Sequence, residues 1–370
     1  MNDTELLHLL ALLKVEGVGD IVAKKLINHC ETAENIFKLK ASKLTSIDGI
    51  GQNLLKKLKD KSVFEKAESE LQYIKNNGIK VCFYQDDNYP ERLKHCVDGP
   101  VLLFYSGTIN WNTRKIISIV GTRQITSYGA EFCRKLIEDL APLNPIIVSG
   151  FAYGVDIFAH QAAMDSNLQT IGILAHGLNQ IYPKSHKRHI AKMEQNGGFM
   201  TEFWSNSNPE KENFVKRNRI VAGIAEATIV IESAEKGGSL ITANMANDYN
   251  RDVFAVPGRT SDKLSQGCNN LIKTQRAHLL TSAADVLYIL NWEIESKARN
   301  DNKVIQKQLF ISLDEDEQKI YNYLQQNGKQ LLDVIAIECN FPIFKIASVL
   351  LNMELKGVVR PLPGKLFEAV

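Results

Sequence analysis

The hydrophobic pattern changes its period along the chain. Residues 1–75 carry apolar side chains at helical spacing, as in Leu6, Leu9, Leu10 and Leu13, which share one face of a predicted first helix. From about residue 115 to 292, short apolar runs alternate with amphipathic segments. The apolar runs predict strands over 116–120, 145–149, 170–175, 199–203, 227–232 and 252–256, and the segments between them predict helices near 127–140, 154–167, 186–196, 211–225 and 239–250. Continuous apolar strands separated by helices predict a Rossmann-like, doubly wound, mostly parallel α/β sheet.

This pattern divides the chain into four parts. Residues 1–75 form a helical domain, and residues 76–295 form an extended Rossmann-like domain that starts with short strands over 80–84 and 101–105. The polar and charged segment 296–312 suits a linker. Residues 313–370 read as three helices followed by a hairpin, which predicts a winged helix. Its third helix, 342–356, holds few basic residues, so a role in protein contacts is favoured over DNA reading.

The helical domain contains a short repeat. Residues 15–19 and 47–51 both read apolar-x-Gly-apolar-Gly, and each precedes a helix that carries Lys and Leu. The pattern is similar to a helix-hairpin-helix turn, in which the glycines admit a DNA phosphate. The acidic neighbours Glu16, Asp20 and Asp48 would repel phosphate, so tight turns between packed helices are an equal alternative.

Composition adds few constraints. The 370 residues include 44 Lys+Arg and 42 Asp+Glu, so a basic surface must be local. The six cysteines are widely spaced without a CxxC pair, which favours a reducing compartment over a disulfide scaffold or a zinc site. No apolar run reaches the roughly 18 residues of a membrane helix. The N-terminus lacks the basic segment of a secretory signal, so a cytoplasmic protein is expected.

Glycine-containing turns follow several of the predicted strands. A strand that ends in glycine and continues into a helix leaves free N–H groups at the positive end of that helix, which favours a phosphate. The segments 116–123 and 146–154 repeat this arrangement, and together they predict a phosphate cradle. Because the carboxyl ends of parallel strands share one edge, further polar residues should line the same groove. The candidate DNA-binding residues are Gly121, Thr122, Arg123, Ser149, Gly150, Tyr153, Lys184, Arg217, Arg219, Lys236, Gly237, Gly238 and Ser239.

Two residue pairs leave alternatives open. Arg217 and Arg219 are two apart on a helix and point to different sides, so one should face the groove while the other braces the fold through carboxylates. The sequence does not decide which. Asp156 and His160 share a helical face and could bind a metal or perform acid–base chemistry. A third ligand is not evident, so a structural hydrogen-bonded pair is favoured, and no metal or other cofactor is expected.

Ordered motifs between about residues 80 and 292 resemble the bacterial DNA-processing protein A family (DprA, also called Smf). The motifs are Ile119-Val120-Gly121-Thr122-Arg123, Ser149-Gly150-x-Ala152-x-Gly154-x-Asp156, Ala159-His160, Tyr182-Pro183, Arg217-Asn218-Arg219-Ile220, Gly238 to Ala243 and Val256-Pro257-Gly258. The resemblance implies a protein, not an enzyme, that binds single-stranded DNA during natural transformation, forms a homodimer and loads the RecA recombinase. It places the DNA in a basic pocket that would include Arg123 and Lys184 and the backbone near Gly121 and Gly238.

The sequence departs from the family pattern at two places. Tyr153 stands where the family usually has arginine, which removes a positive charge and offers a ring that could stack on a base. Gly267-Cys268-Asn269 replaces the more usual Gly-Thr-Asn. The alternative class is a nucleotide phosphoribohydrolase of the lysine-decarboxylase-like Rossmann group. That group has a Thr-x-x-Glu after its glycine turn, and residues 237–243 contain no glutamate.

Overall fold

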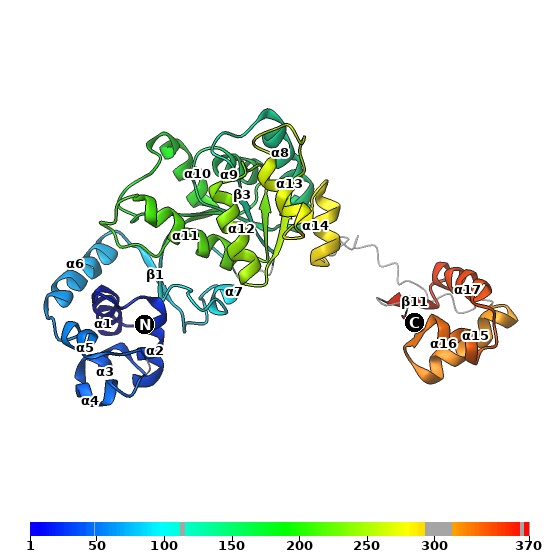
Figure 1. Cartoon of the computed structure of the whole chain (residues 1–370), viewed down its shortest axis with the longest axis horizontal. Coiled ribbons are helices and arrows are strands. Elements are labelled where there is room, and N and C mark those ends of the chain that lie inside the picture. Colours follow the sequence, from blue (N-terminus) through cyan, green and yellow to red (C-terminus); the bar gives the residue numbers. More distant parts are fainter. Residues whose placement is uncertain (48, 112–114, 293–312, 363–365, 370) are drawn as a thin grey trace. The chain divides into compact units, whose positions relative to one another are not determined.

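The computed structural model describes residues 1–47, 49–111, 115–292, 313–362 and 366–369. They belong to two compact units, Met1–Glu295 and Ser296–Val370 (Figure 1). The predicted linker 296–312 lies outside the described residues. The predicted boundary after residue 75 stays a prediction, although α6 ends at Asn76 and β1 begins at Lys80.

A nine-stranded sheet forms the centre of the first unit, in the order β1-β2-β6-β5-β4-β3-β7-β8-β9. Its strands are β1 (Lys80–Phe83), β2 (Leu102–Gly107), β3 (Ile116–Val120), β4 (Ile146–Ser149), β5 (Thr170–Ile173), β6 (Gly197–Thr201), β7 (Ala227–Val230), β8 (Asp252–Ala255) and β9 (His278–Leu279). The strands from β6 to β9 in this order pair in parallel, and β2 and β1 add an antiparallel edge. The predicted Rossmann-like, mostly parallel α/β sheet is therefore confirmed.

The sheet reverses its strand order beside β3. The chain first adds β4, β5 and β6 on one side of β3, and it then returns to place β7 on the other side. Ligands of open α/β sheets bind outside the carboxyl ends of the strands at such a reversal. The fold therefore points to the space between the β3 and β7 ends as the place for a site.

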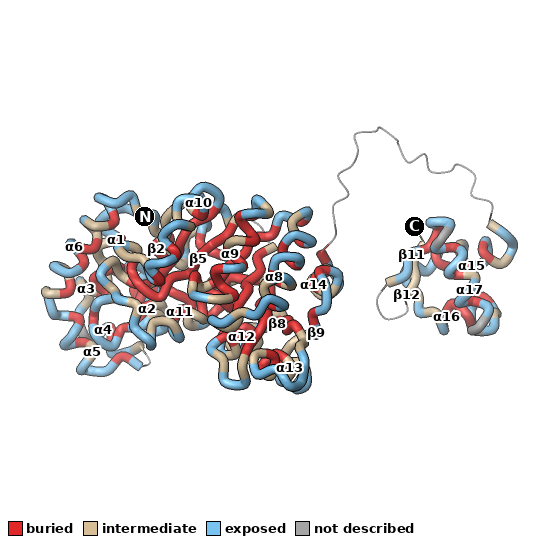
Figure 2. The backbone as a smooth tube through the Cα atoms, turned by 90° about the horizontal axis from the view of Figure 1, so that it is seen from above, coloured by how far each residue is buried: buried red, intermediate tan, exposed pale blue. Residues whose placement is uncertain are grey.

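Helices cover both faces of the sheet, and alternate side chains of a strand belong to opposite layers. Ile116 and Val120 of β3 join one core with α11 (Lys211–Ile224), α12 (Gly238–Asp248) and α13 (Gln266–Lys273). Ile117 and Ile119 join the other with α8 (Ser127–Leu140), α9 (Val155–Asp165) and α14 (Ala283–Leu290). The strands between these layers are buried along their length (Figure 2), which explains why they read as continuous apolar runs.

The helical region packs against the antiparallel edge through a shared core that includes Val101, Leu102 and Phe104. Its helices are α1 (Asp3–Lys14), α2 (Asp20–Cys30), α3 (Ala33–Lys38), α4 (Ala41–Leu44), α5 (Gln52–Lys57) and α6 (Ser62–Asn76). Asp20, at the start of α2, accepts a hydrogen bond from the Val101 N–H at 2.9 Å and pairs with Arg219 at 3.0 Å. The residue that directly follows the first glycine turn therefore takes part in packing the helical region against the sheet, and the two alternatives for the glycine turns stay predictions.

The second unit has the predicted winged-helix order. It contains α15 (Glu315–Asn327), β10 (Gln330–Leu331), α16 (Leu332–Glu338), α17 (Ile343–Leu355), β11 (Val359–Leu362) and β12 (Leu366–Ala369). The three strands form their own small sheet, in the order β10-β12-β11. All six cysteines of the chain are buried free thiols. Among the described helices, none has the length and apolar character needed to cross a membrane.

Candidate functional site

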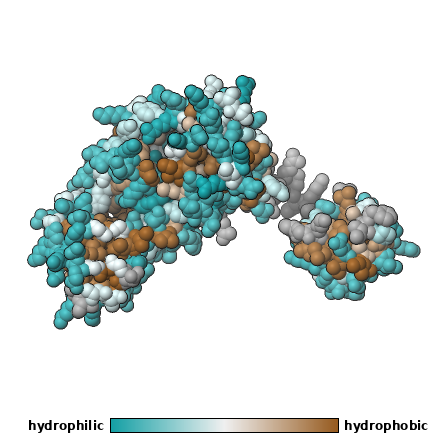
Figure 3. Space-filling model, in the orientation of Figure 1, coloured by the Kyte–Doolittle hydropathy of each residue, from teal (hydrophilic) through white to brown (hydrophobic). Residues whose placement is uncertain are grey.

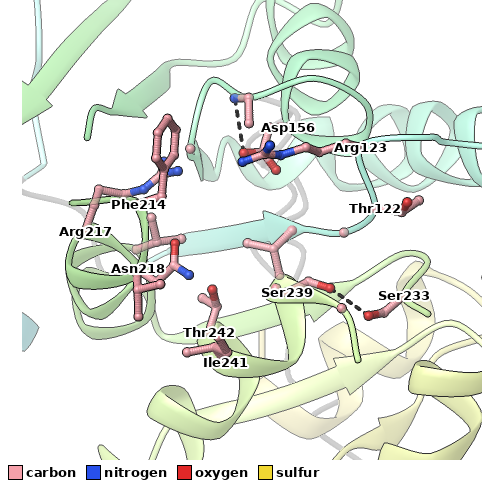
Figure 4. A pocket seen from close by; sticks show the side chains of 18 of the residues that line it. Thr122, Arg123, Asp156, Phe214, Arg217, Asn218, Ser233, Ser239, Ile241 and Thr242 are labelled. Atoms are coloured by element: carbon pink, nitrogen blue, oxygen red, sulfur yellow. Dashed lines mark hydrogen bonds between the residues drawn. The ribbon is translucent and has the colours of Figure 1, made fainter. Parts of the chain in front are cut away.

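A pocket of about 340 Å³ lies at the carboxyl ends of β3, β4 and β7 (Figure 4). The turn after β3 contributes Gly121, Thr122 and Arg123. The segment after β4 contributes Gly150, Ala152, Tyr153 and Asp156. The first turns of α12 form one wall, and one side of α11 forms another. The pocket therefore occupies the place at which the strand order reverses.

The N-terminus of α12 is open to the pocket. The helix begins at Gly238 after Gly237, and no side chain caps its first N–H groups. A Cβ atom built on Gly238 would have no atom within 4 Å, so this backbone borders free space. Free N–H groups at the positive end of an eleven-residue helix favour an anion such as a phosphate.

The turn before α9 is built differently. Gly154 has φ +74°, and a Cβ atom there would lie 2.2 Å from the Thr122 carbonyl oxygen, so glycine is required for this close approach. The carboxylate of Asp156, in the first turn of α9, accepts a hydrogen bond from the Ala152 N–H at 3.2 Å. The expected second phosphate site is therefore already filled by the protein's own carboxylate, and the α12 turn is the one open to an anion.

The two arginines of α11 have different surroundings. Arg217 is buried in the pocket wall, where its Nη1 donates to the Ile173 carbonyl oxygen at 2.6 Å. A Cβ atom on Gly150 would lie 1.9 Å from Nη1, so Gly150 makes room for the guanidinium. Arg219 lies outside the pocket lining and pairs with Asp20 and Glu202. Arg217 is thus the arginine on the pocket side, and Arg219 braces the fold.

Burial and charge oppose each other around Arg217. Burial lowers the pKa of Arg217 to about 10, against the attraction of Asp156. Burial also raises the pKa of Asp156, and the Arg217 guanidinium opposes that rise. Among the residues that line the pocket, Asp156 is the acidic one, and its carboxylate is engaged with backbone and with Arg217. The pocket keeps a positive character because Arg123 and Lys211 also line it.

An aromatic ring lies beside the exposed arginine. The Arg123 guanidinium carbon is 5.5 Å from the ring centroid of Phe214, and the Tyr182 ring meets Phe214 edge-on at 5.6 Å. Tyr153 is 46% exposed and packs edge-on against His186 at 5.1 Å. Aromatic rings next to cationic groups can bind bases and phosphates together. This surface therefore matches the two chemical parts of a nucleotide chain.

Nine of the thirteen candidate residues line the pocket: Gly121, Thr122, Arg123, Gly150, Tyr153, Arg217, Gly237, Gly238 and Ser239. Ser149, Lys184, Arg219 and Lys236 do not. The Ser149 hydroxyl is buried and donates to the Ile119 carbonyl oxygen at 2.6 Å. Lys184 is exposed at the start of a 3₁₀ helix (Lys184–His189), and Lys236 is exposed in the turn next to Gly237.

Five lining residues of α11 were not predicted from the sequence: Lys211, Phe214, Val215, Asn218 and Val221. They follow β6, whose end lies away from the pocket in the strand order, so no strand-end rule points to them. Their spacing of three and four residues places them on one helical face, which is the signal that could have found them. Two acidic residues that follow strands of the sheet have structural roles. Glu232, after β7, accepts a hydrogen bond from the Thr126 N–H at 2.9 Å at the start of α8, and Glu202, after β6, pairs with Lys216 at 2.8 Å.

Asp156 and His160 do not form the expected pair. Thr170 donates its hydroxyl proton to the Ile147 carbonyl oxygen at 2.9 Å, so at 2.6 Å the His160 Nδ1–H must donate to Thr170. His160 Nε2 is buried without a partner, and burial lowers the pKa of this histidine to about 3. No set of three or more metal-ligating side chains is found among the described residues. In the Gly267-Cys268-Asn269 segment, which departs from the family pattern, the side chains serve the fold. Cys268 is buried, and the Asn269 side-chain amide donates a hydrogen bond to the Gly258 carbonyl oxygen at 3.0 Å.

Comparison with known families covers most of the chain. Residues 80–291 match the family model described as DNA recombination-mediator protein A, and residues 308–365 match the DprA winged helix domain. Protein Smf of Escherichia coli is 32% identical over 80% of this chain and 79% of its own length. DNA processing protein DprA of Streptococcus pneumoniae is 40% identical over 55% of this chain and 71% of its own length. Protein Smf of Synechocystis is 28% identical over the full length of both chains.

Solved structures give the same result. The X-ray structure of DNA processing protein A from Streptococcus pneumoniae matches with a TM-score of 0.62 and 31% identity, covering 78% of this chain and 98% of that one. A structure of DNA processing protein A from Helicobacter pylori matches with a TM-score of 0.52 and 28% identity, covering 58% of this chain and 95% of that one. The latter structure is described as showing a single-stranded DNA binding mode.

Proposed function

The chain belongs to the DNA recombination-mediator protein A family, and on that premise we propose that it binds single-stranded DNA in the pocket between the β3 and β7 ends. One observation carries the proposal: the free N–H groups of α12, the Arg123 guanidinium and the Phe214 ring border the same pocket. They supply, in order, a site for a phosphate, a cation for the backbone and a platform for a base.

The geometry supports a strand without sequence preference. Backbone N–H groups and an arginine contact phosphates, which are the same at every nucleotide. A phenylalanine ring stacks on any base, because every base has a π-face. The pocket is also bordered by Tyr153, which adds a second exposed ring close to the turn after β4. A single strand with unstacked bases fits this surface better than a duplex, whose bases are paired.

Arg123→Ala tests the proposal directly. A fluorescence anisotropy titration with a labelled oligodeoxythymidylate, repeated at several salt concentrations, measures both affinity and its salt dependence. We expect weaker binding and a slope of log affinity against log salt that is smaller by about 0.7, which is the contribution of one neutralised phosphate on a single strand.

Arg134→Ala is the matched control. Arg134 is an exposed arginine on α8 that pairs with Glu138 at 3.1 Å and does not line the pocket. The control should bind like the wild type. Unchanged affinity of Arg123→Ala would contradict the placement of DNA in this pocket, and tight binding to duplex without preference for a single strand would contradict the proposed ligand.

We further propose that the bound strand is delivered to the RecA recombinase, in natural transformation or in other DNA recombination. The description of the matched family as a recombination mediator supports this step. The rate of RecA filament formation on DNA covered by single-strand binding protein tests it: addition of this protein should speed filament growth, and no acceleration would contradict loading. The homodimer and the cytoplasmic location stay predictions.

A further inference from the structure

The two halves of the helical region carry opposite charge. Residues 1–37 contain three Lys+Arg and six Asp+Glu, whereas residues 38–66 contain eight lysines and three Asp+Glu. Each half includes one copy of the glycine-turn repeat. The second half therefore concentrates basic charge that the whole-chain balance of 44 to 42 conceals.

The first half is occupied by contacts to the α/β part. Asp20 binds Val101 and Arg219, and the Lys14 ammonium lies 4.5 Å from the ring centroid of Trp204. Trp204 and Ser205 follow β6 at its carboxyl end, and Ser205 also binds Glu70 of α6. The helical region is thus fixed at the carboxyl edge of the sheet, the edge that holds the pocket.

Helix α11 connects the two places. Lys211 at its start lines the pocket, and Arg219, eight residues later, contacts α2 through Asp20. Pocket-lining residues continue along α11 as far as Val221, so the helix that forms this wall of the pocket also contacts the helical region through Arg219.

The basic residues of the second half are exposed on α3 to α6 and in the turns between these helices, which lie together at one end of the unit in both views (Figures 1 and 2). Figure 3 shows hydrophilic side chains along the outer edge of this end. Lys38 pairs with Glu34 and Lys57 with Glu16. Among the described residues, no ion pair is found for Lys40, Lys43, Lys56, Lys59, Lys61 or Lys66, so their charges are available to a ligand.

We propose that these six lysines form a second DNA contact, which binds the phosphate backbone of the same single strand beyond the pocket. This inference rests on the proposed function and extends its binding site from one pocket to a path. Lysine ammonium groups act as point charges toward phosphates and carry no sequence preference. The contact should therefore increase affinity for long strands and leave short ones unaffected.

The test compares two oligodeoxythymidylates of about 6 and about 30 nucleotides, a range around the usual size of a single-strand site. The triple variant Lys40→Gln, Lys43→Gln and Lys59→Gln removes three of the exposed charges. The matched control, Lys135→Gln, Lys263→Gln and Lys273→Gln, removes three exposed lysines that do not line the pocket and lie outside residues 38–66. Circular dichroism verifies that both variants remain folded.

We expect the wild type and the control to bind the long oligonucleotide more tightly and with a steeper salt slope than the short one. The triple variant should bind the short oligonucleotide like the wild type. On the long one its slope should be smaller by about 2, because each neutralised phosphate contributes about 0.7. The second contact would be overturned if the triple variant bound the long strand with the same affinity and salt slope as the wild type. It would also be overturned if the three lysines increased affinity for duplex DNA alone. Failure of the wild type to bind either oligonucleotide would instead overturn the proposed function itself.

Discussion

Replacing Arg219 by methionine separates the structural role of this arginine from DNA binding. The side chain is buried and joins three elements: it donates to the Asp98 carbonyl oxygen, pairs with Asp20 of α2 at 3.0 Å and pairs with Glu202 after β6. Methionine keeps much of the volume of arginine and removes the charge. Glu202 then remains buried with Lys216 as its partner at 2.8 Å.

Removing one partner of a buried ion pair costs about 3–5 kcal/mol, because the remaining charge is left without compensation. Lys216 still compensates part of the Glu202 charge, so we expect a decrease near 3 kcal/mol in the free energy of unfolding. Adding Glu202→Gln should restore about 1 kcal/mol or more, since the neutral amide no longer carries the uncompensated charge. Such a decrease is large against a typical total stability of about 5–15 kcal/mol.

Urea unfolding followed by tryptophan fluorescence measures this change in the first unit alone, because Trp111, Trp204 and Trp292 all belong to it. DNA affinity is then measured below the unfolding transition. Arg219→Met should bind single-stranded DNA like the wild type, whereas Arg217→Met, which alters the pocket wall, should bind more weakly. Equal reductions of affinity in the two folded variants would refute the division of roles between these arginines.

Two further predictions concern the pocket ring and a buried histidine. Phe214→Leu should weaken single-strand binding about tenfold or more, since stacking contributes about 1–3 kcal/mol per base. Phe132→Leu is the control, and an unchanged affinity of Phe214→Leu in the titration would contradict a stacking role. His160 has a folded-state pKa of about 3 against 6.5 in the unfolded chain, so its contribution to stability is complete above pH 6.5 and is lost as the pH falls toward 3. Between pH 6.5 and 4.5 the wild type should lose about 2 kcal/mol more than His160→Gln in urea unfolding. Parallel pH profiles of the two proteins would contradict a neutral buried His160.

The alternation of apolar runs and amphipathic segments was sufficient to predict the six central strands and the fold class. The reason is that a strand buried on both faces must be apolar along its whole length, as Ile116–Val120 is. The glycine turns also predicted the edge of the sheet at which the pocket lies. The order of the strands did not follow from the sequence, because it depends on which strands pair across long crossovers.

The details of the site depended on that order. Arg217 and Arg219 could not be told apart by spacing, since the position of α11 over the sheet decides which of them meets the pocket. Phe214 was missed because it follows a strand remote from the pocket, and it reaches the pocket lining through the path of the helix across the carboxyl edge. Ser149 looked available in the sequence, but its hydroxyl is used within the sheet by the Ile119 carbonyl oxygen.

A structure of the protein with a short oligodeoxythymidylate would show whether the pocket holds the strand. We expect a phosphate group at the N-terminus of α12, within hydrogen-bond distance of the backbone N–H groups of Gly238 or Ser239, with Arg123 beside the DNA backbone and a base against Phe214. DNA bound elsewhere on the unit, with no nucleotide between the β3 and β7 ends, would contradict this placement.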